Sequence, residues 1–168
     1  MNNVRKAIRD RRSIRKFTPE TVTEEEINEI LQAGAWAPSG LNNQPWRFVS
    51  ISTRNALNRL AELTRYGHIL KGCPAGIAVF IDREAMYNDL KDHQAAGACI
   101  QNMLLAAHEI GLGAVWLGEI LNRADEVNQV LDLAERYLLM AVIALGHPDG
   151  NRPQSSRKNL NELIIKKV

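Results

Sequence analysis

Several features that would define a protein class are scarce or missing in this sequence. Only two cysteines, Cys73 and Cys99, occur among the 168 residues, which excludes a disulfide framework and a multi-cysteine metal site. Neither has an obvious base nearby, so both are predicted to be packing residues. The longest apolar stretch, residues 95–107, is interrupted by Gln101 and Asn102 and is too short to span a bilayer. With no signal peptide predicted, a cytoplasmic protein is expected.

Common nucleotide-binding and metal-binding motifs are also missing. Gly111, Gly113 and Gly118 come close to a dinucleotide fingerprint, but the third glycine is late and the predicted order is helix then strand. No Walker lysine is present. His108-Glu109 lacks the second histidine of a zinc-protease helix, and the four histidines are well spread. Neither a tightly held nicotinamide nucleotide nor a metal ion is predicted.

The net charge is only +2, but it is unevenly distributed. Seven basic residues and one acidic residue lie between Arg5 and Lys16, so the remaining chain is net acidic. This distribution argues against a nucleic-acid coat and favours a local anion site near the N-terminus.

The best anion-binding candidates are Arg11, Ser13 and Arg15, because arginine grips a phosphate bidentately and a hydroxyl completes the cradle. Folding could bring Arg157 and Lys158 to the same anion. A solvated basic face is the competing interpretation.

Composition and periodicity predict a single α+β domain covering residues 1–168. Apolar residues make up 45% and charged residues 24% of the chain, as in ordinary globular proteins. Helices are predicted at 3–12, 24–36, 53–64, 93–110 and 122–133, and strands at 47–52, 77–81, 114–117 and 137–145. Thr23 and Glu26 form a capping box, while Thr53 and Asn122 are predicted caps. Because helices and strands mix without strict βαβ alternation, a sandwich is expected.

A helix and a loop carry further signals. Residues 93–110 are nearly all apolar or small, which is typical of a central helix, and Gly111 is a candidate left-handed cap. Residues 37–46 contain two prolines, a glycine and two asparagines and form a loop. Its polar side chains could bind a planar heterocycle, with Trp46 anchoring it, although an ordinary loop is the alternative. Trp36 and Trp116 are predicted core residues.

Taken in order, these segments resemble the nitroreductase family of FMN-dependent oxidoreductases. The matching stretches are RRSIRKF at 11–17, APSGLNNQPW at 37–46, QNMLLAA at 101–107, GLG at 111–113, WLG at 116–118, GHP at 146–148 and RK at 157–158. They span nearly the whole chain, and their order and spacing are more specific than any one of them.

The resemblance implies a three-layer sandwich with a mixed, mainly antiparallel sheet flanked by helices. It also implies an interlocked homodimer with two FMN sites, each built from both chains, and a dimer-interface role for helix 93–110. The residues implied near the ribityl phosphate are Arg11, Arg12, Ser13, Arg157 and Lys158, with Arg15 at the pyrimidine edge of the flavin. Those implied along the isoalloxazine ring are Pro38, Ser39, Gly40 and Asn42 from the partner, with Trp116, Leu117 and Gly118 on the other side.

The resemblance further implies a ping-pong reaction. NAD(P)H would deliver hydride to flavin N5, and a nitroaromatic, quinone or similar acceptor would then take the electrons, with no catalytic side chain. Two alternatives stay open. One is a specialised enzyme of the same fold, such as a reductive dehalogenase or a flavin-cleaving type, and the other is a flavin-binding protein that does not turn over. Little chain lies between residues 66 and 92 to cover the substrate, so Tyr66, His68 and Tyr87 are candidates for that role.

Overall fold

The computed structural model describes residues 3–151 and 153–168. The α-helices are α1 (Asn3–Asp10), α2 (Glu24–Ala35), α3 (Arg54–Ala61), α4 (Gly67–Gly72), α5 (Asp89–Glu109), α6 (Ala124–Val130) and α7 (Leu160–Leu163). The strands are β1 (Trp46–Ile51), β2 (Ala75–Asp82), β3 (Gly113–Leu117) and β4 (Tyr137–Gly146). Short 3-10 helices are η1 (Gly40–Asn42), η2 (Arg83–Ala85) and η3 (Glu119–Arg123).

The four strands form one sheet in the order β1-β2-β4-β3, with every neighbouring pair antiparallel. The segment after α1 adds two isolated bridges at the sheet margin, a parallel one between Ser13 and Ala114 and an antiparallel one between Phe17 and Pro148. The sheet is therefore mixed and mainly antiparallel, as expected.

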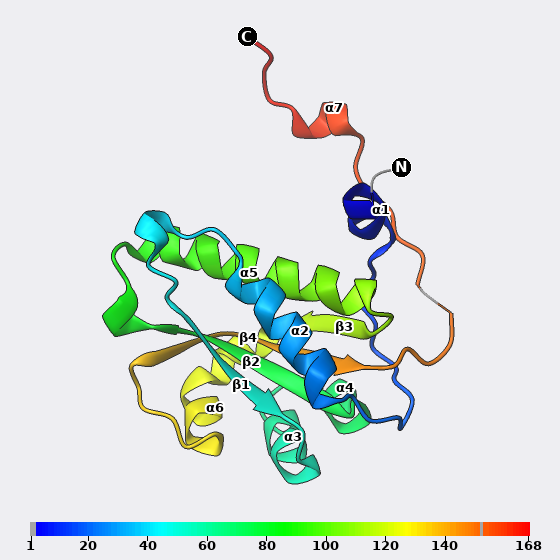
Figure 1. Cartoon of the computed structure of the whole chain (residues 1–168), viewed down its shortest axis with the longest axis vertical. Coiled ribbons are helices and arrows are strands. Elements are labelled where there is room, and N and C mark those ends of the chain that lie inside the picture. Colours follow the sequence, from blue (N-terminus) through cyan, green and yellow to red (C-terminus); the bar gives the residue numbers. More distant parts are fainter. Residues whose placement is uncertain (1–2, 152) are drawn as a thin grey trace.

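Helices cover both faces of this sheet (Figure 1). Helices α2 and α5 lie on one face, and α3, α4 and α6 lie on the other. Strand β2 is buried along its whole length because its side chains alternate between the two layers. Ile77 and Val79 join the core under α5, whereas Ala78 and Phe80 join the core under α3. The predicted three-layer α+β sandwich is confirmed.

Local signals explain several elements. The Thr23–Glu26 capping box is present, with Glu26 N–H donating to Thr23 Oγ1 (3.2 Å) and Thr23 N–H donating to Glu26 (2.8 Å). Gly111 adopts φ +89°, which confirms its predicted left-handed conformation. Helix α2 lies close to α5 at Gly34, where a β-carbon would stand 2.7 Å from Met103 Cγ. None of the helices in the described ranges has the length and apolarity needed to cross a bilayer.

Several predicted boundaries are wrong. Helix α1 ends at Asp10 instead of residue 12, and α3 ends at Ala61 instead of residue 64. Helix α5 begins at Asp89, four residues before the predicted start, because Asn88 caps it by accepting a hydrogen bond from Lys91 N–H (3.1 Å). The smaller element α4 was not predicted.

The predicted caps also differ. Thr53 precedes α3 but makes no side-chain capping bond. The helix predicted at 122–133 is instead η3 followed by α6. The break falls at Arg123, whose φ of −130° and ψ of 36° are not helical, so Asn122 is not a cap.

Candidate functional site

Three guanidinium groups from opposite ends of the chain meet beside α1. Burial lowers the pKa of Arg11, and the nearby positive charges of Arg157 and Arg12 lower it further. Arg12 donates to the Arg11 carbonyl (2.9 Å), and Arg157 donates to Ser155 Oγ and to the Ser156 carbonyl (2.7 Å). Within the described residues none of the three guanidiniums forms an ion pair with a carboxylate. The pKa of Asp10 is lowered first by its hydrogen bond from Lys6 and also by the nearby charge of Arg12, whereas the charges that shift the pKa of Arg11 are all positive. Clustered like charges without a close carboxylate contact favour an anion site over a solvated basic face.

The chain then carries Ser13 and Arg15 along the edge of the sheet. Ile14 N–H donates to the Ala114 carbonyl (3.0 Å), which fixes this segment against β3, and Arg15 donates weakly to the Ser13 carbonyl (3.4 Å). A groove of about 200 Å³ opens here, lined by residues 13–16, 148–151 and 153. Lys158 follows Arg157 directly and is exposed. The predicted phosphate and pyrimidine-edge residues therefore lie on one side of the molecule.

Strand β3 presents its last residues differently from the prediction. Trp116 is 40% exposed and is not a core residue; it lies on β3, the last strand in the order of the described sheet. Leu117 is buried in the core under α3, so only its backbone could face a ligand. Gly118 is exposed. Trp36 is also not a core residue, since it stands at the end of α2 and is 80% exposed.

The loop at residues 38–45 is strained. Leu41, Asn42 and Gln44 have φ values of 53°, 54° and 46°, a left-handed conformation that costs non-glycine residues about 1–2 kcal/mol each. Ser39 Oγ accepts from Gln44 N–H (3.0 Å), and the Gln44 side chain donates to the Asn42 carbonyl (3.1 Å). Strain of this kind persists only where surrounding structure imposes it, and it is concentrated at functional sites.

Asn43 and Asp92 anchor the middle of this loop. The Asn43 amide donates to Asp92 Oδ1 (2.8 Å) and to the Ala85 carbonyl (2.9 Å). Asp92 is fully buried and also accepts from the Tyr87 and Asn88 N–H groups (2.9 Å each). Burial acts to raise the pKa of Asp92, but hydrogen bonds from Asn88, Asn43 and Tyr87 outweigh it and lower the pKa. An ionised carboxylate therefore ties the loop to the first turn of α5.

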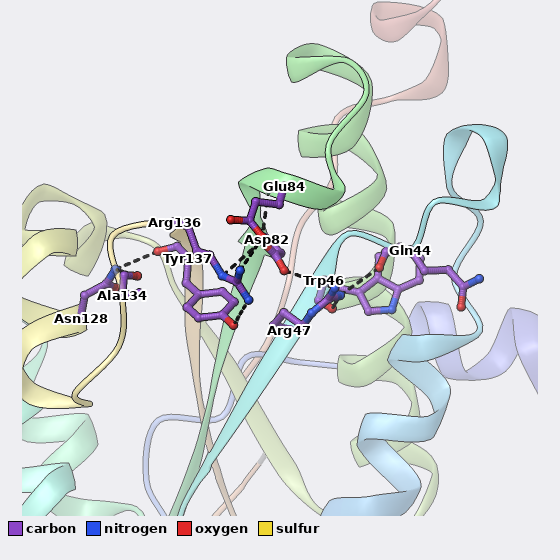
Figure 2. A network of polar contacts seen from close by, with 9 residues as sticks. All are labelled: Gln44, Trp46, Arg47, Asp82, Glu84, Asn128, Ala134, Arg136 and Tyr137. Atoms are coloured by element: carbon purple, nitrogen blue, oxygen red, sulfur yellow. Dashed lines mark hydrogen bonds and ion pairs between the residues drawn. The ribbon is translucent and has the colours of Figure 1, made fainter.

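A second buried carboxylate, Asp82, anchors the end of the loop (Figure 2). Arg47 donates to the Gln44 carbonyl (3.2 Å) and the Trp46 carbonyl (2.8 Å) and pairs with Asp82 (3.3 Å). Asp82 also lies 3.7 Å from Arg136, and its N–H donates to the Pro45 carbonyl (2.8 Å). Trp46 is buried, which confirms its predicted role as the loop's anchor.

Both anchoring carboxylates were missed in the sequence. The available signal was a carboxyl group inside a segment predicted to be buried. Asp82 directly follows a continuous apolar strand, and Asp92 stands at the start of the central helix. Burying such a group requires partners, and those partners turn out to hold the loop.

The two halves of the predicted site lie at opposite ends of α5 (Figure 1). The loop is attached at Asp92 in the first turn of α5, whereas Ser13 is attached at Ala114, beyond the end of that helix. A helix of 21 residues is roughly 31 Å long. One chain therefore carries the arginine cluster, Ser13 and Arg15 near the end of α5 where β3 begins, with Trp116 on that strand. It does not bring Pro38, Ser39, Gly40 and Asn42 to the same place.

Comparison with known proteins gives a consistent result. The chain matches the Nitroreductase family model over residues 8–67 and 62–147. It is 36% identical over 151 residues to a Methanothermobacter thermautotrophicus protein assigned as an NADH dehydrogenase/NAD(P)H nitroreductase, a match that covers 89% of this chain and 79% of that protein. It is 32% identical to the NADPH-flavin oxidoreductase of Vibrio harveyi, covering 90% and 68% of the two chains.

Solved structures agree. A crystal structure of a protein from Desulfovibrio desulfuricans assigned as a nitroreductase, in complex with FMN, superposes with a TM-score of 0.95 at 54% identity, covering 100% of this chain and 98% of that one. The NADPH:FMN oxidoreductase of Vibrio harveyi complexed with NAD+ superposes with a TM-score of 0.90 at 29% identity, covering 99% and 78%. The sequence motifs, the three-layer fold and these matches together establish that the chain belongs to the nitroreductase family.

Proposed function

We propose that this protein is an NAD(P)H-dependent FMN oxidoreductase that reduces nitroaromatics, quinones or similar acceptors. The observation that carries the proposal is the cluster of Arg11, Arg12 and Arg157, which forms no ion pair with a carboxylate of the described residues, because such a cluster fits a doubly charged phosphate. The descriptions of similar proteins support the cofactor and the nicotinamide donor. They include an NADPH-flavin oxidoreductase, a nitroreductase structure in complex with FMN and an NADPH:FMN oxidoreductase structure complexed with NAD+.

The arginine cluster and Ser13 would bind the FMN phosphate, with Lys158 beside them. Each hydrogen bond to a charged group contributes about 1.5–3 kcal/mol. The negative phosphate would also offset the mutual repulsion of the positive charges on Arg11, Arg12 and Arg157. Because this repulsion is present in the apo-protein and relieved in the complex, it would favour FMN binding.

The remaining contacts require a second copy of the chain, and we propose a homodimer. The loop and the arginine cluster are separated by the length of α5, so a two-fold partner with α5 antiparallel would bring the loop of one chain to the arginines of the other. A groove of about 660 Å³ between α1, α2 and α5 is lined by apolar side chains, among them Leu105 and the exposed Trp36, together with polar ones such as Asn102. The tail adds exposed apolar side chains at Leu160, Leu163, Ile165 and Val168.

Each remaining predicted residue has a place in this arrangement. Pro38, Ser39, Gly40 and Asn42 of one chain would line the flavin ring, opposite Trp116 and the Leu117–Gly118 backbone of the other. Arg15 would put a positive charge at the pyrimidine edge, which favours two-electron reduction. Bound FMN supplies the redox chemistry, a ping-pong transfer of two electrons from NAD(P)H to the acceptor through flavin N5. Free, buried Cys73 and Cys99 suit the expected reducing cytoplasm.

The test is a visible absorption spectrum before and after anaerobic addition of NADH or NADPH. A flavin spectrum that bleaches is expected, followed by recovery when a quinone or nitroaromatic is added. A flavin band that never bleaches would favour the alternative that the protein binds flavin but does not catalyse turnover. A colourless protein that FMN cannot reconstitute would overturn the cofactor assignment.

A further inference from the structure

We propose that Tyr87 and Lys91 form one wall of the acceptor-binding site and select acceptors that carry polar or negatively charged oxygen atoms. This inference rests on the proposed FMN site, because it places these two side chains beside the loop that would line the flavin. It adds to that site a hydrogen-bond donor and a cation that the family motifs do not contain.

The position of Tyr87 follows from its contact with Gly40. A β-carbon added at Gly40 would overlap the hydroxyl oxygen and Cζ of Tyr87, so the end of the phenol ring lies directly against the Gly40 α-carbon. Residue 40 must therefore lack a side chain for Tyr87 to occupy this place. Gly40 belongs to the loop proposed to line the flavin, so the Tyr87 hydroxyl borders the same surface.

The backbone of Tyr87 is fixed while its hydroxyl stays available. Tyr87 N–H donates to the buried Asp92 carboxylate (2.9 Å), the same group that holds Asn43 in the loop. Tyr87 is 40% exposed, and in the part of the chain that the structure describes its hydroxyl has no hydrogen-bond partner. A donor that is both pre-positioned and unpaired suits a ligand oxygen.

Lys91 adds positive charge at the same point. Its ammonium lies 5.5 Å from the centre of the Tyr87 ring, within the range of a cation–π contact. Lys91 is exposed and has no carboxylate partner among residues 3–151 and 153–168. The FMN phosphate would not neutralise it, because the proposed phosphate site is the arginine cluster. An acceptor with a carboxylate, sulfonate, nitro or quinone oxygen matches this pair of groups.

The chain around Tyr87 is short. Only η2 and residues 86–88 separate β2 from α5, so this connection contributes no long covering segment of its own. Tyr87 and Leu90 are both exposed on this connection and the first turn of α5. The acceptor would therefore meet Tyr87 and Lys91 directly.

The experiment isolates the step in which the acceptor binds. Holoenzyme reduced anaerobically with dithionite is mixed with an uncharged naphthoquinone or with its sulfonate, and flavin reoxidation is followed against acceptor concentration. Lys91→Met is expected to weaken sulfonate binding roughly threefold to fivefold and to leave the uncharged quinone unchanged. Tyr87→Phe is expected to weaken both acceptors about twofold to tenfold. Raising the salt concentration is expected to reduce the effect of Lys91→Met.

The matched control is Lys71→Met, which removes a lysine paired with Glu62 on the other side of the sheet. FMN retention checks that each variant is folded, and Lys91→Arg is expected to restore sulfonate binding. If Lys91→Met and Lys71→Met give the same preference between the two acceptors, the inference is overturned while the proposed function stands. If wild-type protein holds no FMN, the proposed function fails first and this inference fails with it.

Discussion

Replacing Arg11 and Arg157 with alanine tests the phosphate site from both ends of the chain. Neither guanidinium forms an ion pair with a carboxylate of the described residues, and each repels the other. At about 1.5–3 kcal/mol for each charge-assisted hydrogen bond, loss of one bond per arginine weakens FMN binding by about 3–6 kcal/mol. That corresponds to an increase in Kd of roughly 10² to 10⁴-fold.

The same change is expected to leave the apo-protein as stable as before, or slightly more stable, because it removes like-charge repulsion and no internal ion pair. The assay is titration of apo-protein with FMN by fluorescence quenching, alongside thermal unfolding without FMN. Arg59→Ala is the control, since Arg59 is an exposed arginine on α3. An unchanged Kd in the double variant would refute the phosphate assignment. A large drop in apo-protein stability would show that these arginines serve the fold.

Three further predictions concern the rest of the site. Arg15→Leu should lower the two-electron potential of bound flavin by roughly 20–60 mV, equivalent to losing about 1–3 kcal/mol of stabilisation, and potentiometry showing no shift would place Arg15 away from the pyrimidine edge. Hydrogen bonds from Thr64 and Arg65 lower the pKa of Glu119 from 4.5 to about 2, so its stabilising effect is present above pH 4.5 and is lost as the pH falls toward 2. Thermal unfolding of Glu119→Gln should therefore differ from wild type at neutral pH and converge with it in acid; a constant difference would contradict this account. Gly40→Ala should weaken FMN binding because its methyl group would collide with Tyr87, and adding Tyr87→Ala should restore part of the affinity. No recovery in the same titration would mean that this collision is not the cause of the weaker binding.

Local patterns predicted much of the fold. The capping box at Thr23 and the continuous apolar run of β2 depend on neighbouring residues only, and both are present. The start of α5 after Asn88 was missed because apolar periodicity is weak before residue 93. The Asn88 capping bond, which starts the helix there, does not contribute to that periodicity. Cys73 and Cys99 are buried as predicted, and burial raises the pKa of their thiols to about 11 and about 12.

The geometry of the candidate site could not be predicted in the same way. The left-handed residues of the loop are held by Asp82 and Asp92, and both contacts join segments far apart in the sequence. The exposure of Trp36 and Trp116 also depends on tertiary structure, since aromatic composition alone favours burial. The proximity of Arg157 to Arg11 depends on how the two ends of the chain fold toward each other, which local sequence patterns do not specify.

The location of Arg157 links cofactor binding to the order of the C-terminal tail. Residues 153–163 are exposed throughout, and α7 stands away from the sheet (Figure 1). A phosphate held by both Arg11 and Arg157 would act as a non-covalent cross-link between the first helix and this tail, and it would restrict the tail's conformational freedom. Removing FMN would then first increase the rate of proteolytic cleavage near the carboxyl terminus. The sheet and its two cores would be affected only later.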